Sequence, residues 1–161
     1  MYPTKEETAL WVAINLSQRR LYRQMDAALK AAELPPLRWY DVLWAVEQRG
    51  ESGMRAFELE QGLLFEQSNL SRLLQRLVKE GLIHEAVCPE DRRGKTLTIS
   101  KQGASIRKSM WEVYGPLMHQ HLAGIDDSKM MVEIASHLNS LHASVPDSVS
   151  PAFTGRSVNK D

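Results

Sequence analysis

The chain has 161 residues, a length that suits a single domain with a sizeable core. Its 20 lysines and arginines balance 20 acidic residues, which excludes attachment to nucleic acid by bulk charge. A single cysteine excludes an internal disulfide framework, and no apolar run is long enough to cross a bilayer. Because the sequence begins without a signal peptide, we expect a cytoplasmic protein with no membrane partner.

A long first helix is predicted from about Glu6 to Ala32, where Gly and Pro are absent and apolar residues recur at helical spacing. One small domain cannot cover a helix of this length, and its near-heptad spacing favours packing against another chain. Leu34-Pro-Pro-Leu37 ends the helix, and the apolar pattern of residues 39–46 predicts a short second helix that ends near Gly50.

A helix-turn-helix is predicted next, from residues 56–63 and residues 67–80. Gly81 follows the second of these helices and suits its C-terminal cap. Leucines recur in that helix at i, i+3, i+4 and i+7, so one face packs on the core and the other is polar. The candidates for core packing in the first of the two helices are Phe57 and either Leu59 or Leu63.

A β-hairpin is predicted around the turn Pro89-Glu-Asp-Arg-Arg-Gly94, between the β-prone runs 82–87 and 96–99. Ser100 suits the N-terminal cap of a fifth helix over residues 101–122. The Gly115-Pro116 pair should kink or split that helix.

A sixth helix is predicted to begin at Asp126 or Asp127. Its apolar stripe consists of Met130, Met131, Ile134, Leu138 and Leu141. Residues 144–161 are rich in Ser, Pro and Val, so we expect a tail that is flexible or pinned by a partner subunit.

Basic residues are concentrated in two segments of this neutral chain. Between Gln67 and Lys79 there are three basic residues and no acid, and between Arg92 and Trp111 there are six basic residues and no acid. A helix with a basic, amide- and hydroxyl-bearing face, followed by an arginine-bearing hairpin, is typical of proteins that bind duplex DNA. Two alternatives remain open from the residues alone, a solvated helix face and a charged turn that serves solubility.

Residues 70–83, followed by Pro89-Glu-Asp-Arg-Arg93 and Ile99-Ser-Lys-Gln-Gly103, resemble the MarR family of bacterial winged-helix transcription regulators. The order of elements agrees with that family over residues 7–143. The resemblance implies a homodimer whose first, fifth and sixth helices intertwine, with the fourth helix in the major groove of double-stranded DNA. The signature Asp-x-Arg of the family falls on Asp91 and Arg93, which implies that Arg93 enters the minor groove.

The expected fold is therefore mainly α with a small β-hairpin, a winged helix-turn-helix flanked by long dimerisation helices. We divide the single fold unit into an N-terminal dimerisation helix (1–35), a DNA-binding lobe (36–100), C-terminal dimerisation helices (101–143) and the tail (144–161). The chain departs from the family pattern in the turn at residues 64–66, and at Glu60, which should point outward if packing is normal.

The predicted DNA contacts carry the side-chain types that bind bases and phosphates. Ser68, Ser71 and Arg72 are the strongest candidates for the major groove, and Asp91 is expected to orient a wing arginine because a free carboxylate would be repelled by phosphate. The full predicted set is Gln67, Ser68, Asn69, Ser71, Arg72, Gln75, Arg76, Lys79, Arg92, Arg93, Lys95 and Lys101.

Relatives in this family often respond to a small amphipathic or phenolic ligand, bound between the DNA-binding lobe and the dimerisation helices. The alternative is that the aromatic residues of this chain simply fill the core and the dimer interface. The candidate ligand residues are Trp11, Trp39, Tyr40, Trp111 and Tyr114.

We expect no cofactor and no metal. Cys88 could sense oxidants if nearby basic residues lowered its pKa, but an incidental cysteine is the preferred interpretation. The spacings of His119, His121, His137 and His142 match no closed zinc site.

We also expect no enzymatic activity. The sequence has no Gly-rich phosphate loop, no His-Glu-x-x-His motif and no nucleophile elbow. The expected function is that of a homodimeric repressor that a small ligand could release. Its better rival is a winged-helix module that binds only protein, because a fold does not determine a function.

Overall fold

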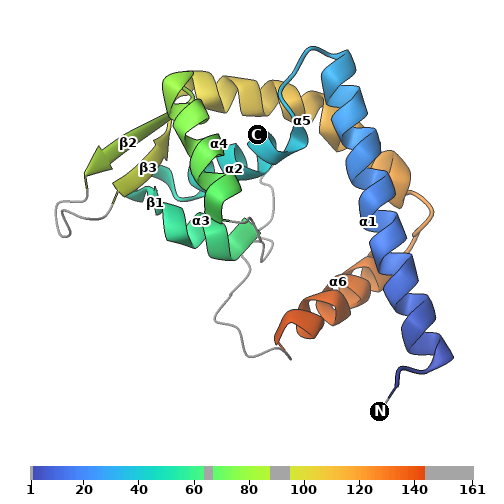
Figure 1. The fold of residues 1–161 in the computed structure, drawn as a ribbon. Helices are drawn as coiled ribbons and strands as arrows, with labels where there is room; N and C mark the ends of the chain where they lie inside the picture. Colours follow the sequence, from blue (N-terminus) through green and yellow to red (C-terminus); the bar gives the residue numbers. More distant parts are fainter. Residues whose placement is uncertain (1, 64–66, 88–94, 144–161) are drawn as a thin grey trace.

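Helix α1 (Lys5–Ala31) begins at a reciprocal cap, in which the Glu7 N–H donates to Thr4 Oγ1 (3.1 Å) and the Thr4 N–H donates to the Glu7 carboxylate (2.6 Å). Its 27 residues make it about 40 Å long. In this computed structural model, which describes residues 2–63, 67–87 and 95–143, only Met25 and Leu29 of α1 are buried. The helix is therefore anchored by its last turns, and its N-terminal half projects from the rest of the chain (Figure 1).

The remaining elements follow the predicted order. They are α2 (Leu37–Gln48), the single turn η1 (Gly50–Ser52), β1 (Met54–Arg55), α3 (Ala56–Leu63), α4 (Gln67–Lys79), β2 (Ile83–Val87), β3 (Lys95–Ile99), α5 (Lys101–Leu122) and α6 (Ser128–Ala143). The mainly helical winged helix-turn-helix is confirmed, with boundaries within two residues of those expected.

The wing is a three-stranded sheet and not only a hairpin. The strand order is β1-β3-β2, all antiparallel, with Met54 opposite Leu97 and Glu85 also opposite Leu97. Gly53 makes the third strand possible, because a Cβ built at Gly53 would lie 2.2 Å from Thr96 Cγ2, too close for any other residue. Two residues are too short a run to carry a strand periodicity, which is why the sequence did not predict β1.

The core gathers around α2. Val42, Leu43 and Val46 are fully buried there, against Leu59 of α3 and Leu77 of α4. The expectation that Phe57 faces this core is wrong, since its side chain is 52% exposed. Successive helix residues are rotated by about 100°, so residues 57 and 59 of one helix cannot both face the same core.

A second corner of the fold joins α4 to α5. Gly81 ends α4 in a left-handed conformation (φ 71°), which confirms the predicted cap. Ser100 caps α5 as predicted, because its Oγ accepts from the Gly103 N–H (2.9 Å) and donates to the Gly81 carbonyl oxygen (2.6 Å). A Cβ at Gly103 would lie 2.0 Å from the Leu82 carbonyl oxygen, so glycine allows α5 to start directly against this corner.

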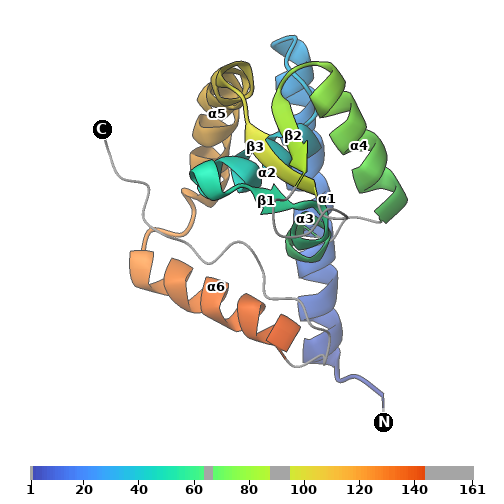
Figure 2. The ribbon, with the colours of Figure 1, turned by 90° about the vertical axis from the view of Figure 1, so that its left-hand side faces the viewer.

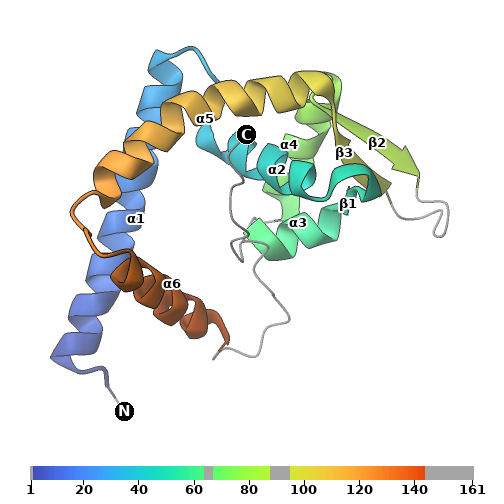
Figure 3. The same ribbon diagram turned by 180° about the vertical axis from the view of Figure 1, so that it is seen from behind.

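Two helical arms leave the lobe formed by α2–α4 and the sheet. Helix α5 continues through Pro116 and bends without splitting (Figure 3). Helix α6 begins where Asp127 Oδ1 accepts from the Lys129 N–H (2.8 Å), and with the first half of α1 it extends away from the lobe of α2–α4 and the sheet (Figure 2). Among the α6 side chains that the structure describes, only Met131 is partly buried. Within the described residues, no helix is long and apolar enough to cross a membrane.

Candidate nucleic-acid interface

Helix α4 presents one apolar face and one polar face. Leu70, Leu73, Leu74 and Leu77 are buried against the core, as the leucine spacing predicted. The predicted contact residues whose side chains are described in this helix all lie on the exposed surface: Asn69, Ser71, Arg72, Gln75, Arg76 and Lys79. Gln67 and Ser68 lie in the first turn, and their side chains are outside the described part of the chain. The helix therefore offers a polar surface without an acid from Asn69 to Lys79.

Arg76 and Arg72 differ in how firmly they are held. The Arg76 Nε pairs with Glu80 Oε1 at 2.9 Å, and its guanidinium carbon lies 5.2 Å from the centre of the Trp39 ring. Arg72 is exposed and forms no ion pair within the described residues. Arg72 is thus the more adaptable cation of the two, while Arg76 is fixed at the side of the helix.

The described part of the wing carries a cross-strand ion pair. Lys95 Nζ lies 2.7 Å from Glu85 Oε1, and Lys101 is exposed at the start of α5. The remaining predicted wing residues, Asp91, Arg92 and Arg93, lie outside the described residues, as does Cys88. Strand β2 starts close to the end of α4 and runs away from that helix (Figure 1).

A groove of about 630 Å³ lies between α3, α4 and the sheet. We call it the α4 groove; its lining residues are Ala56, Phe57, Glu60, Leu70, Ser71, Leu74, Gln75, Glu85 and Lys95. Glu60, expected to point outward, is partly buried on its wall. The sequence did not single out Phe57 or Glu60 as site residues, because neither belongs to the basic segments.

An aromatic cluster joins α2 to α5. The Tyr40 ring stacks on Trp111 at 6.0 Å between ring centres and meets the edge of Tyr114 at 5.2 Å. Beside it lies a mainly apolar cavity of about 250 Å³ between α1, α2 and α5. Its lining residues are Gln18, Leu21, Tyr22, Met25, Leu37, Tyr114, Met118, His121 and Leu122.

The structure brings together only part of the predicted ligand set. Tyr114 lines the cavity, and Tyr40 and Trp111 stand behind Tyr114. Trp11 is 69% exposed on the projecting half of α1, and Trp39 is buried beneath Arg76. The sequence alone does not predict which cavity an aromatic side chain will line, because that depends on how separate helices pack against one another.

Titratable groups are also partly covered at this junction. Burial raises the pKa of Asp41 to about 6. Burial, and secondly the nearby Asp41 carboxyl, raise the pKa of Tyr22 on α1 and of Tyr114 on α5. On the far side of the cluster, Arg107 Nη2 donates to Glu47 Oε1 (3.5 Å), while its Nε lies 2.5 Å from Glu47 Oε2 in a charge contact without hydrogen-bond geometry. These groups connect the DNA-binding lobe to the helical arms.

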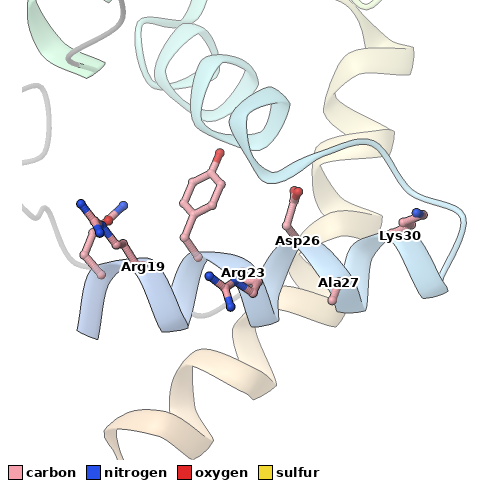
Figure 4. A pocket seen from close by; sticks show the side chains of 7 residues that line it. Arg19, Arg23, Asp26, Ala27 and Lys30 are labelled. Atoms are coloured by element: carbon pink, nitrogen blue, oxygen red, sulfur yellow. The ribbon is translucent and has the colours of Figure 1, made fainter. Parts of the chain in front are cut away.

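A basic cavity of about 520 Å³ runs along α1 (Figure 4), lined by Gln18, Arg19, Tyr22, Arg23, Asp26, Ala27 and Lys30. Asp26 is directed toward the segment that leads into α2 and accepts a hydrogen bond from the Leu37 N–H (2.8 Å). Pro36 at the start of α2 provides no side-chain cap, so Asp26 supplies one from another helix. This contact fixes α1 to the lobe.

No group of three or more metal-binding side chains occurs among the described residues.

The chain matches a model of the MarR family over residues 33–94, which include α2, the helix-turn-helix and strands β1 and β2 of the wing. It is 27% identical over 123 residues to the HTH-type transcriptional repressor IacR of Pseudomonas putida, covering 73% of this chain and 72% of that protein. Its fold is similar to the MarR family transcriptional regulator Sco3205 from Streptomyces coelicolor, solved in complex with DNA, with a TM-score of 0.81, 19% identity and 92% of each chain covered.

AbsC, another MarR family transcriptional regulator from Streptomyces coelicolor, has the same fold, with a TM-score of 0.76 and 19% identity over 89% of this chain and 97% of that one. The family match covers most of the lobe of residues 36–100, and the similarity of fold extends over the helical arms as well. The chain is therefore similar to the MarR family of transcriptional regulators in the sequence of residues 33–94 and in its fold.

Proposed function

We propose that the chain is a homodimeric repressor that binds double-stranded DNA in a sequence-specific manner. The observation that carries this proposal is the exposed polar face of α4, which has no acid between Asn69 and Lys79 and which contacts strand β2 of the wing. The relative from Pseudomonas putida is named a repressor, and the Streptomyces regulator Sco3205 was solved with DNA. We assign no catalytic activity to the chain and place it in the cytoplasm, where its DNA would be.

In this proposal α4 lies in the major groove, whose width of about 12 Å accepts one helix. Ser68, Ser71 and Arg72 read base edges, with Gln67, Asn69 and Gln75 beside them. Arg93 enters the minor groove, oriented by Asp91, because an arginine is attracted by the strong negative potential of a narrow A/T-rich groove. The remaining cations hold phosphates: Arg76, Lys79, Arg92, Lys95 and Lys101.

The homodimer is supported by apolar residues that the single chain leaves uncovered. On α1 these are Leu10, Trp11, Val12 and Leu16, and on α6 they are Met130, Val132, Ile134, Leu138 and Leu141. Full burial of one such side chain contributes about 1.5–3 kcal/mol of favourable free energy. Pairing of these arms between two copies would bury many of them at once, and clustered exposed apolar side chains mark an interaction surface. A two-fold dimer presents two α4 helices and would recognise a roughly palindromic site.

The cavity between α1, α2 and α5 is the place where a small phenolic or amphipathic ligand would release the DNA. Its volume of about 250 Å³ lies just below the range of about 300–1,000 Å³ for drug-sized ligands, which suits a single substituted ring. It touches both the lobe and the arms, so an occupant could change the spacing of the two α4 helices. Single-ring phenols should then raise the melting temperature of the wild type but not of a Met118→Trp variant with a filled cavity.

The experiment that tests the proposed function is selection of duplexes from a random library by the purified protein. We expect enrichment of a near-palindrome whose half-sites lie about one helical turn apart. An Arg72→Ala and Arg76→Ala double variant, altered only on the exposed face of α4, is the control and should lose the enrichment. If wild-type protein enriches no duplex at low salt, the chain is instead a winged-helix module for protein partners.

A further inference from the structure

Phe57 exposes an aromatic ring beside the helix that is proposed to read DNA. Its side chain is 52% exposed in the first turn of α3, and a partner that covered this apolar surface would gain free energy. The turn that carries it is held in place, because the Arg55 N–H donates to Glu58 Oε2 (2.7 Å) and Glu58 Oε1 pairs with Arg49 (3.1 Å). The ring is therefore presented from a fixed backbone.

The α4 groove places this ring next to side chains that read bases. Phe57 lines the same groove as Ser71 and Gln75 of α4, and Leu70 and Leu74 contribute apolar surface. A glutamine makes paired hydrogen bonds to adenine N6 and N7 in the major groove, and an aromatic ring makes an apolar contact with the thymine C5-methyl group. Glutamine and phenylalanine on one groove are thus complementary to A·T base pairs.

The charges of the groove favour base edges over phosphates. Glu60 lines its wall, partly buried, and no ion pair of Glu60 is formed within the described residues. The charge of Glu85 is offset by Lys95, whose Nζ lies 2.7 Å away. A phosphate in the groove would be repelled by the Glu60 carboxylate, whereas an uncharged methyl group would not.

We propose that Phe57 contacts thymine C5-methyl groups in the major groove, which makes α3 a second determinant of sequence preference beside α4. This inference rests on the proposed DNA binding. The ring favours sites that carry thymine next to the bases read by Ser71 and Gln75. Phe57 acts by apolar contact alone, so its effect depends on the methyl group and not on the hydrogen bonds of the base pair.

Replacement of thymine by deoxyuracil tests this contact directly, since it removes only the C5-methyl group. The probe is a duplex selected from a random library by the wild-type protein, with each thymine replaced in turn and the affinity measured by fluorescence anisotropy. At one or two positions in each half-site the wild type should lose about three- to fivefold in affinity, the effect of burying one methyl group. Phe57→Ala should bind the thymine and deoxyuracil duplexes equally at these positions.

Two variants serve as controls. Phe57→Leu retains an apolar group and should keep part of the preference for thymine. Val87→Ala removes another exposed apolar side chain of the same lobe, one that does not line the groove, and should keep the full preference. Thermal melting verifies that all variants fold.

The proposal is overturned if deoxyuracil has no effect on the wild type, or if it weakens the wild type and Phe57→Ala equally. Either result leaves the proposed function standing, because the duplex is still bound. Failure of the wild type to bind any duplex removes the proposed function and this inference together.

Discussion

The Ser100 hydroxyl donates a hydrogen bond to the carbonyl oxygen of Gly81 at 2.6 Å, across 19 residues of sequence. The Ser100 Oγ in turn accepts from the Gly103 N–H, so one buried side chain ties the end of α4 to the start of α5. The position of the candidate recognition helix relative to the helical arm is therefore set partly by a single hydroxyl.

We predict that Ser100→Ala lowers the free energy of unfolding by about 1–2 kcal/mol, because it removes a helix cap and the donor to the Gly81 carbonyl oxygen. Urea unfolding followed by circular dichroism measures the change. Ser100→Thr keeps the hydroxyl and should lose much less. Equal stability of Ser100→Ala and the wild type would show that this contact does not hold the corner together.

Asp41 gives a prediction for pH. Its pKa is raised to about 6 by burial, above its value in the unfolded chain, so the folded protein holds the proton more tightly. The folded state is favoured by this proton at pH 4, and the advantage is lost as the pH rises from about 4 to 6. Asp41→Asn should therefore be more stable than the wild type at pH 7, by about 2 kcal/mol or less.

The measurement is the difference in unfolding free energy between Asp41→Asn and the wild type, taken at several pH values. The difference should grow between pH 4 and pH 6 and stay constant above it. Glu51→Asn, which alters an exposed acid of η1, is the control and should give a flat difference. A pH-independent difference for Asp41→Asn would mean that the Asp41 carboxyl titrates normally.

The uncovered arms predict the oligomeric state. Val132 of α6 is 68% exposed in the single chain, and Val87 of β2 is 63% exposed. Val132→Asp places a charge in the proposed dimer interface and should shift the protein toward monomer in sedimentation velocity. Val87→Asp makes the same change at similar exposure on the wing and should remain dimeric. If both variants sediment as the wild type does, α6 does not take part in a dimer.

Arg72 is predicted to select bases. Because one well-formed pair of hydrogen bonds to a base discriminates by about 1–3 kcal/mol, Arg72→Ala should reduce the preference at one base pair of each half-site by about tenfold or more. Lys79→Ala should instead weaken binding to all sequences alike. Binding of each variant to a set of single-base operator variants measures both. An unchanged base preference in Arg72→Ala would show that other residues of α4 select the bases.

Much of the fold was predictable because it depends on local patterns. The spacing of the leucines predicted α4, and the uninterrupted apolar periodicity predicted α1. Ser100 and Gly81 predicted the helix caps at the corner between α4 and α5. Strand β1 was missed because its two residues pair with β3, more than 40 residues away. Phe57 was placed in the core because it is apolar, although the phase of α3 turns it outward.

The candidate site was predicted less completely than the fold. The polar face of α4 could be read from the sequence, since it is the complement of the leucine face. The pKa of Asp41 and the cap that Asp26 gives to α2 could not, because both arise where separate helices meet. For the same reason Trp11 and Trp39 lie away from the cavity that Tyr114 lines.

The salt dependence of duplex binding tests the central claim most directly. A neutral chain that binds DNA through local cations must still release counterions from the DNA. The logarithm of the affinity for a selected duplex should therefore fall steeply and linearly with the logarithm of the salt concentration. We predict a loss of at least about a hundredfold between about 50 and 200 mM salt, given several phosphate contacts per dimer. Absence of binding at low salt, or an affinity that salt leaves unchanged, would contradict DNA recognition by α4 and the wing.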